Sequence, residues 1–282
     1  MILKEVTLQN FRNYPSLSVS FSDGINVFLG ENAQGKTNLM EAIYALALAR
    51  SPRTSNEKEM IRWQEDSAKI TGKIQKRVST FPLEIIFSKK GKIAKVNHLE
   101  QKKLSQYIGQ LNVVLFAPED LNLVKGAPAN RRKFLDMELG QMNPVYLHDL
   151  VQYQRILKQR NLYLKQLVTG KAKDEVYLDV LTEQLAILGA DLLVYRLQFI
   201  KKLEAWAQPL HKEISLEREE LTIAYKSNVE LSDEMDKDAL FLKLMEAFKQ
   251  GKSRERDQAV TLFGPHRDDL VFQVNGRNVQ NF

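Results

Sequence analysis

The chain has 282 residues, of which 44% are hydrophobic and 27% charged, a composition typical of a globular protein with one large domain or two smaller ones. It contains no cysteine, which excludes disulfides and thiolate metal sites and indicates a reducing compartment. The net charge of +6 is modest, the first residues lack the pattern of a signal peptide, and no apolar run reaches the length of a membrane span, so the sequence predicts a soluble cytoplasmic protein without membrane association.

The N-terminal residues predict an antiparallel β-meander. Ile2 to Leu8 has the composition of a strand, and apolar residues alternate at Leu17, Val19 and Phe21. The turn-forming residues 22–24 then lead into the apolar run Ile25 to Leu29, which we expect to be a buried strand. Such a meander differs from a series of βαβ units, in which a helix connects parallel strands.

The most specific motif is Gly30-Glu31-Asn32-Ala33-Gln34-Gly35-Lys36-Thr37, a complete G-x-x-x-x-G-K-[ST] phosphate-binding loop. The expected strand precedes it, and a helical pattern with Leu39, Ile43 and Leu46 on one face follows it. In such a loop the glycines let backbone N–H groups surround the phosphates, Lys36 reaches the β- and γ-phosphates, and the Thr37 hydroxyl coordinates Mg²⁺. The correct flanks favour this interpretation over a chance match, so the sequence predicts binding of a nucleoside triphosphate.

The region from Asp66 to Leu104 is strongly basic and rich in β-pattern. It contains ten Lys or Arg residues against three acidic ones, a local charge of +7, which leaves about −1 for the rest of the chain. Leu83 to Phe87 and Ile93 to Val96 predict a hairpin within it. The region could bind a nucleic-acid backbone, or it could be a solvated β-surface with lysines on its edge strands; the charge alone leaves both open.

One stretch resembles a strand that carries the acid of a hydrolytic site. The apolar run Leu111 to Phe116 is followed by Glu119 and Asp120, and an acid in this position can support Mg²⁺. However, Pro118 separates the run from the acids, which disfavours this role.

The middle of the chain predicts long helices. Asn143-Pro144 begins one that Gly170 ends, a second continues to Pro209, and the two form an antiparallel hairpin. A third helix is expected from Lys237 to Lys249, ending before Gly251.

The C-terminal residues return to a β-pattern. Strands are expected at Thr261 to Phe263 and Leu270 to Val274, followed by a hairpin turn at Asn275-Gly276 with Phe282 in its second strand. The polar run His266 to Asp269 is interpreted as a charged turn before a strand.

Four separated motifs together resemble the RecF family of bacterial recombination mediators. They are Leu8-Gln9-Asn10-Phe11-Arg12-Asn13-Tyr14, the phosphate loop with Asn38, Phe116 to Leu121 with Arg131 to Asp136, and Gly264-Pro265-His266-Arg267-Asp268-Asp269-Leu270. They occur in order over essentially the whole chain, which makes the resemblance far more specific than the phosphate loop alone.

The resemblance implies an α/β P-loop NTPase fold, an ABC/SMC-like head with an antiparallel β-meander and an inserted α-helical arm domain. We expect residues 1–130 to form the head lobe with the phosphate loop, residues 131–258 the arm, and residues 259–282 the return to the head. The resemblance also implies ATP and Mg²⁺ as cofactors, with Arg12 and Asn13 near the nucleotide.

The same resemblance implies ATP-dependent dimerisation on single-stranded and gapped duplex DNA, weak ATP hydrolysis, and action with RecO and RecR in loading recombinase at gaps. It places Glu119 and Asp120 in a loop beside the site, away from the Mg²⁺-supporting strand. Members continue past residue 282 with a Ser-x-Gly-Gln signature and paired aspartates, so we expect an N-terminal fragment that holds half of a composite ATP site. The alternatives are a stand-alone P-loop kinase and a non-hydrolysing DNA clamp switched by nucleotide.

Overall fold

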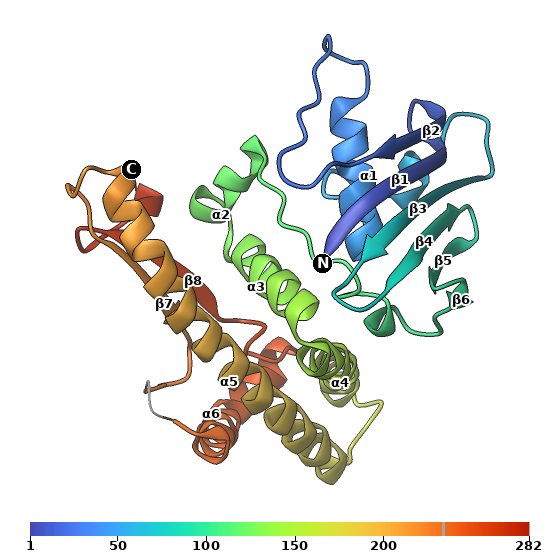
Figure 1. The fold of residues 1–282 in the computed structure, drawn as a ribbon. Coiled ribbons are helices and arrows are strands. Elements are labelled where there is room, and N and C mark those ends of the chain that lie inside the picture. The colour runs from blue at the N-terminus through green and yellow to red at the C-terminus, as the bar shows by residue number, and fades with distance from the viewer. Residues whose placement is uncertain (233–234, 282) are drawn as a thin grey trace. The chain divides into compact units, whose positions relative to one another are not determined.

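The structure is a computed structural model and describes residues 1–232 and 235–281, without the side chains of Glu119 and Asn281. The chain forms two compact units. Unit 1 contains Met1–Phe116 and Gly140–Pro144, and unit 2 contains Ala117–Leu139 and Val145–Phe282. Unit 1 is built on a β-sheet, and unit 2 consists mainly of helices (Figure 1).

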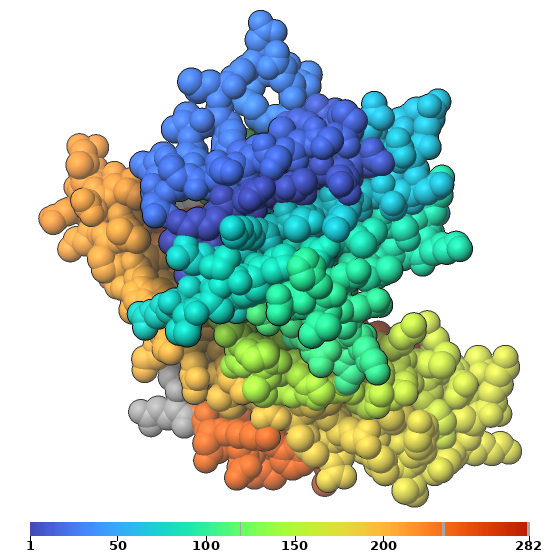
Figure 2. Space-filling view, turned by 45° about the vertical axis from the view of Figure 1, so that its right-hand side comes forward, coloured from blue at the N-terminus to red at the C-terminus, as the bar shows by residue number. Residues whose placement is uncertain are grey.

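Unit 1 contains an antiparallel sheet whose strands follow the order β2-β1-β3-β4-β5-β6. Its strands are β1 (Ile2–Phe11), β2 (Tyr14–Ser20), β3 (Ser67–Gln75), β4 (Thr80–Ser88), β5 (Gly91–Val96) and β6 (Leu99–Glu100). The first two strands of the expected meander and the basic hairpin are therefore confirmed. In the space-filling view, β3, β4 and β5, coloured cyan to green, form a large part of the visible surface of unit 1 (Figure 2).

One face of this sheet is buried against helix α1 (Lys36–Leu48). Along β3, Ala68, Ile70 and Ile74 are buried while the residues between them point to the opposite, solvent-facing side, which is the period-2 pattern of a half-buried strand. Gly72 continues the buried row, and a Cβ there would overlap the side chain of Leu46 on α1. A glycine at this position therefore lets the helix lie close to the sheet.

The strand expected at Ile25 to Leu29 does not form. These residues have no regular secondary structure, and Ile25 and Leu29 are 90% and 89% exposed. An extended segment becomes a strand only when a neighbour pairs with its backbone, and none of the described residues does so; β1 already pairs with β2 on one side and β3 on the other. The run from Leu111 to Phe116 likewise lacks regular secondary structure, and Phe116 is 92% exposed.

Unit 2 holds the predicted long helices. They are α4 (Pro144–Val168), α5 (Glu175–Ile214) and α6 (Lys237–Gln258), preceded by α2 (Leu121–Lys125) and α3 (Pro128–Met142). Asp174 caps α5 by accepting hydrogen bonds from the amides of Val176 and Tyr177. Leu164 and Leu167 of α4 pack with Leu178 of α5, so the expected helical hairpin is confirmed. A three-stranded sheet in the order β7-β8-β9 completes the unit, with strands β7 (Leu221–Lys226), β8 (Asp269–Val274) and β9 (Arg277–Asn278). Short 3-10 turns, η1 to η4, lie at Glu57–Met60, Leu104–Gln106, Pro118–Asp120 and Val279–Asn281.

The core of unit 2 lies where α4, α5 and α6 meet. Tyr146, Leu185, Leu193 and Leu240 are among its fully or almost fully buried residues. A smaller cluster, with Ile200 of α5 at its centre, joins that helix to β7 and β8. The apolar residues at helical spacing in α4, α5 and α6 thus form the core of unit 2, as their spacing predicted.

Two helix ends differ from expectation. Helix α5 continues through Pro209 to Ile214, and α6 continues through Gly251 to Gln258. Pro209 is exposed, so water can satisfy the carbonyl that loses its helical partner. Gly251 is buried, and a Cβ there would overlap the ring of Phe263; this glycine serves close packing and does not end the helix.

The expected strand at Thr261 to Phe263 is also wrong, because these residues are irregular. Thr261 instead accepts and donates side-chain hydrogen bonds in the buried interior of unit 2, with Arg160 and Asn161 as partners. The hairpin at Asn275-Gly276 is confirmed, with φ angles of 50° and 73°. Phe282 lies outside the described residues.

The polar run His266 to Asp269 forms a turn that leads into β8, as expected. Asp269 accepts two hydrogen bonds from the buried guanidinium of Arg131, at 2.7 and 2.9 Å. Asp268 accepts from the hydroxyls of Tyr225 and Ser227, each at 2.8 Å. The carboxylates of this motif therefore join α3, β7 and β8 within unit 2.

No helix in the described ranges combines the length and the apolar character that crossing a membrane requires. The division into three domains at residues 130 and 258 stays a prediction, since the two compact units have other bounds.

Candidate nucleotide-binding site

The phosphate loop has the backbone shape that its sequence predicts. Gly30, Ala33 and Gly35 have positive φ angles of 155°, 65° and 110°. Helix α1 begins directly after the loop, at Lys36, and residues 30–34 are exposed. Successive turns of this kind point backbone N–H groups into one concavity, and the helix N-terminus adds partial positive charge there. The loop can therefore receive an anion of several phosphates.

Lys36 folds back over this loop. Its ammonium group donates a short hydrogen bond to the carbonyl of Gly30 and another, 2.6 Å long, to the carbonyl of Glu31. Phosphate oxygens are stronger acceptors for an ammonium group than neutral carbonyls. The side chain is thus held at the mouth of the loop, where a bound triphosphate would replace the two carbonyls. Thr37 is exposed in the first turn of α1.

The turn between β1 and β2 packs against the same loop. A Cβ on Gly35 would lie 2.5 Å from the hydroxyl oxygen of Tyr14, so only glycine leaves room for that ring. The amide of Asn13 donates to the carbonyl of Gln34 at 3.4 Å and accepts from Asn38 at 2.8 Å. Asn13 therefore lies against the loop and connects it to α1, and its expected place near the nucleotide stays a prediction.

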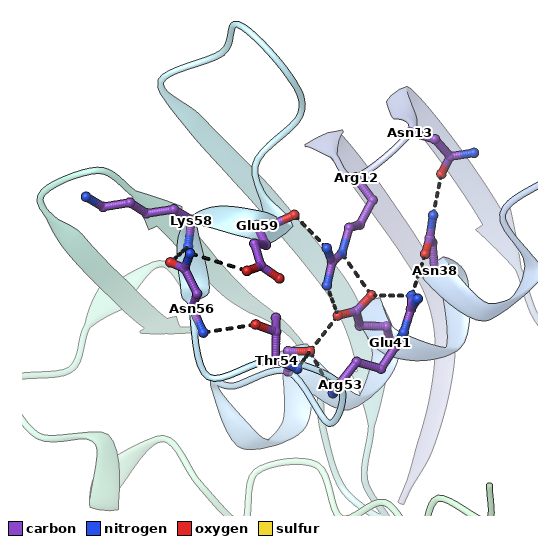
Figure 3. Close-up of polar contacts among 10 residues, drawn as sticks. Arg12, Asn13, Asn38, Glu41, Arg53, Thr54, Asn56, Lys58 and Glu59 are labelled. Carbon is purple, nitrogen blue, oxygen red and sulfur yellow. Dashed lines mark hydrogen bonds and ion pairs between the residues drawn. The ribbon is translucent and has the colours of Figure 1, made fainter. Parts of the chain in front are cut away.

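Arg12, the neighbouring residue, is turned toward a buried carboxylate. Its Nε and Nη2 donate to Glu41 at 3.0 and 2.6 Å, and its Nη1 donates to the carbonyl of Glu59 at 2.8 Å (Figure 3). Glu41 also accepts from Ser51 at 2.5 Å and from Arg53 at 3.3 Å. Its side chain is fully buried, so these three partners, through four hydrogen bonds, supply the charge and hydrogen bonds that the carboxylate needs.

Arg53 links this carboxylate to the phosphate-loop helix. Its Nη1 also donates to Asn38 at 3.0 Å, and Asn38 in turn contacts Asn13 (Figure 3). One continuous polar network therefore runs from the loop through the first turns of α1 to residues 51–59. The described residues contain no group of three or more His, Asp or Glu side chains able to hold a metal.

Comparison with known proteins identifies the family. Residues 1–253 match the AAA ATPase domain family. The DNA replication and repair protein RecF of Enterococcus faecalis is 58% identical, over all of this chain and 76% of its own length. The Bacillus subtilis protein of the same name is 54% identical with the same coverage. The chain belongs to the RecF family.

Solved structures of RecF-family proteins have the same fold. One, described as RecF-ATP in the RecFOR pathway, has a TM-score of 0.94 and 31% identity, covering 99% of this chain and 75% of that one. Another, described as RecF-ATPrS, has a TM-score of 0.92 and 31% identity, with coverages of 100% and 76%. The expected α/β P-loop ATPase fold is therefore confirmed.

Asp120, the second acid after the apolar run, has a structural role in this RecF-family chain. Asp120 Oδ2 accepts a hydrogen bond of 2.7 Å from the amide of Ala117 and so caps its own short turn. The side chain of Glu119 lies outside the described residues. With no strand at Leu111 to Phe116, the local arrangement lacks the strand that a Mg²⁺-supporting acid would follow.

Three lysines of the basic region of this RecF-family chain lie on the solvent-facing side of the sheet in unit 1. Their partners on β4 are Ile86 for Lys69, Pro82 for Lys73 and Glu84 for Lys95. Positions 82, 84 and 86 face the same side of the strand, so the three lysines share that side. Lys69 is paired with Glu84 at 2.7 Å. Within the described ranges, Lys73 and Lys95 form no ion pair, so their charges remain available to an anionic partner.

Sequence reasoning missed Tyr14, Asn38, Glu41 and Arg53 as parts of the site. Only weak signals could have indicated them: Tyr14 follows Asn13 in a recognised motif, and Asn38 and Glu41 follow the loop on α1. Arg53 lies in an irregular segment without a pattern, and only the fold brings it to Glu41.

Proposed function

We propose that this chain is the ATP- and DNA-binding part of a recombination mediator. In this proposal it binds ATP with Mg²⁺ at Gly30 to Thr37 and engages single-stranded and gapped duplex DNA. It thereby helps to load recombinase at gaps during recombinational repair and replication-fork maintenance. The names of the relatives, which describe DNA replication and repair proteins, support this role.

The observation that carries the proposal is the ammonium group of Lys36 at the mouth of a phosphate loop. Two backbone carbonyls hold it there, within reach of any triphosphate that enters the loop. The backbone N–H groups would hold the phosphates, and the Thr37 hydroxyl would hold Mg²⁺. When bound, the ion would neutralise charge between the β- and γ-phosphates.

Arg12 and Asn13 receive different roles in this proposal. Asn13 already contacts the loop and can hydrogen-bond a bound nucleotide from the side of β1. Arg12 is occupied by Glu41, so its contribution would be to fix the β1–β2 turn against α1, unless the nucleotide draws its guanidinium away.

The proposal includes partners and an activity of the longer protein. We propose ATP-dependent homodimerisation, weak DNA-dependent ATP hydrolysis and association with RecO- and RecR-type mediators. The described placement of a RecF-ATP structure in the RecFOR pathway supports the mediator partners. A clamp switched by nucleotide without hydrolysis is the second candidate, because Asp120 is committed to capping its own turn.

ATP binding by Lys36→Ala and the unchanged chain tests the proposal. Loss of a charge-assisted hydrogen bond to phosphate should weaken ATP binding about tenfold or more, measured by titration calorimetry with Mg²⁺. Lys58→Ala, an exposed lysine in the 3-10 turn Glu57–Met60, is the matched control and should bind as the unchanged chain does. Equal affinities for all three chains would contradict the assignment.

The assembly part of the proposal is tested in a chain as long as the RecF proteins that this one matches, since it covers 76% of their length. There, Lys36→Ala should abolish the dimer that forms on addition of ATP, as seen by light scattering. An ATP-dependent dimer that survives the substitution would rule out the nucleotide switch.

A further inference from the structure

Trp63 is an exposed aromatic side chain on a rigid part of unit 1. It is 85% exposed, although an indole ring offers one of the largest hydrophobic areas that a side chain can bury. It follows the 3-10 turn Glu57–Met60 and precedes β3, at one end of the sheet. The nucleotide site described above does not use it.

The backbone on both sides of this ring is held in place. The amide of Arg62 donates to the carbonyl of Asn10 at 2.8 Å, and Ile61 forms a β-bridge with Phe11. The amide of Glu65 closes the turn by donating to the carbonyl of Arg62 at 3.1 Å, and Met60 is fully buried. The ring is therefore presented to solvent by a fixed turn, which lowers the entropy cost of binding a partner on it.

Cationic side chains are held at the same turn as Trp63. Arg62 belongs to the same turn, and Lys89 reaches it from the β4–β5 hairpin by pairing with Asp66 at 2.7 Å. Lys90, beside Lys89, is exposed and forms no ion pair with any described residue. The acids of the turn, Glu65 and Asp66, already have Arg62 and Lys89 as partners, at 3.9 and 2.7 Å.

The chemistry around Trp63 favours a nucleobase over a protein surface. Its sequence neighbours, Arg62 and Gln64 to Asp66, are all polar or charged, whereas a protein interface centres an aromatic anchor among other apolar residues. An isolated aromatic ring with cations beside it is the arrangement on which bases of single strands stack while their phosphates are neutralised. In a duplex the bases are already stacked on one another and leave no free face.

We propose that Trp63 is a stacking platform for an unpaired base of single-stranded DNA, with Lys90 and Lys89 contacting the adjacent phosphates. The inference rests on the proposed DNA-binding function and adds to it the place where unpaired bases are recognised. It explains how a gap can be distinguished from continuous duplex: only the gap offers an unstacked base to the ring.

Fluorescence provides a direct test, because the chain contains two tryptophans. In a Trp206→Phe variant the emission comes from Trp63 alone. Titration with a thymidine homopolymer should quench that emission to saturation, and continuous duplex should quench it far less. Equal quenching by both forms of DNA would overturn the proposal.

Affinity and its salt dependence give a second, independent readout. Trp63→Ala should weaken binding of the thymidine homopolymer about 5- to 150-fold, the range expected for loss of one stacked base. It should leave the slope of log K against log salt unchanged, because stacking releases no counterions. Lys90→Ala should reduce that slope by about 0.7. Trp206→Ala, at a tryptophan that is 67% exposed on α5, is the matched control and should change neither quantity.

The outcomes separate this inference from the proposed function. If the unchanged chain binds DNA while Trp63→Ala binds the homopolymer equally well, the stacking role fails and DNA binding stands. If Trp63→Ala instead abolishes association with a mediator protein and leaves DNA affinity intact, the surface recognises protein and the proposal is wrong. Failure of the unchanged chain to bind any DNA would overturn both. Unchanged circular dichroism of Trp63→Ala confirms that it folds.

Discussion

Individual buried charges in this chain are matched by specific partners. Glu41 is fully buried and meets two arginines and a hydroxyl, and the side chain of Arg160 is 2% exposed and pairs with Glu255 at 2.5 Å. A buried charge without such a partner would be strongly destabilising. At the scale of single residues, the fold is therefore specified by polar pairs as well as by apolar packing.

His266 is a buried group whose protonation is disfavoured. Its Nε2 must donate to the carbonyl of Thr261 at 3.2 Å, so its Nδ1 accepts from the Tyr153 hydroxyl at 2.7 Å. Burial lowers the pKa of His266 to about 4, and the neighbouring positive charges of Arg267 and Arg132 act in the same direction, against the hydrogen bond to Thr261. The native state thus holds a neutral imidazole.

This pKa predicts a loss of stability in mild acid. His266 binds a proton near pH 6.5 in the unfolded chain but only near pH 4 in the folded chain. The contribution of neutral His266 to the free energy of unfolding is therefore complete above pH 6.5 and is lost as pH falls toward 4. The shift corresponds to at most about 3 kcal/mol of unfolding free energy. Urea unfolding at several pH values measures it, and His266→Asn, which keeps an acceptor for Tyr153, should remove this part of the pH dependence. Parallel curves for the two chains would refute it.

At the scale of elements, helix α6 depends on a glycine that the sequence suggested as its end. Gly251 is buried in the helix interior, where the ring of Phe263 occupies the space that a Cβ would need. Phe263 also stacks edge-on against Phe248, with ring centroids 6.3 Å apart. The glycine therefore allows an aromatic contact between α6 and the segment that follows it.

Gly251→Ala should destabilise the protein although alanine favours helix. The gain in helix propensity is about 1 kcal/mol, whereas overpacking against the Phe263 ring costs about 1–3 kcal/mol. The net loss, seen as a lower urea midpoint, should largely disappear in Gly251→Ala combined with Phe263→Leu. A loss of the same size in the double variant, relative to Phe263→Leu alone, would show that the ring is not the cause.

Such elements show what sequence could and could not predict. Patterns that act within a few residues predicted α1, the α4–α5 hairpin and the turn at Asn275-Gly276, because periodicity and turn chemistry are local. Ile25 to Leu29 was assigned wrongly, because a strand needs a partner that its own residues do not specify. Helix α3 and strand β7 went unpredicted, since their mixed polar composition carries little periodic signal.

The candidate site likewise contains residues that a local motif predicts and residues that only the fold brings together. The phosphate loop is a contiguous motif whose backbone shape follows from its glycines, so the sequence alone could propose Lys36 and Thr37 as phosphate and Mg²⁺ ligands. Glu41 and Arg53 meet only because α1 and residues 51–59 fold together. Their pairing depends on tertiary structure, which a single sequence does not reveal.

For the whole molecule, charge distribution matters more than total charge. The net charge is +6, yet the region from Asp66 to Leu104 alone carries +7. Lys73 and Lys95 stand on the solvent-facing side of the sheet without an ion-pair partner among the described residues, whereas Lys69 is neutralised by Glu84. Burial alone would raise the pKa of Glu84, but hydrogen bonds from Lys69 and His98 lower it, so this carboxylate stays charged and paired.

This uneven charge predicts which lysines govern the salt dependence of DNA binding. Each lysine that contacts a duplex phosphate contributes about 0.9 to the slope of log K against log salt. Replacing both Lys73 and Lys95 with alanine should therefore reduce the slope by up to about 2, measured by fluorescence anisotropy with a labelled duplex. Lys201→Ala, an exposed lysine on α5 outside the basic region, provides the matched control and should leave the slope unchanged. If the double variant and the control have the same slope, this face of the sheet does not contact DNA, and its lysines keep the sheet solvated instead.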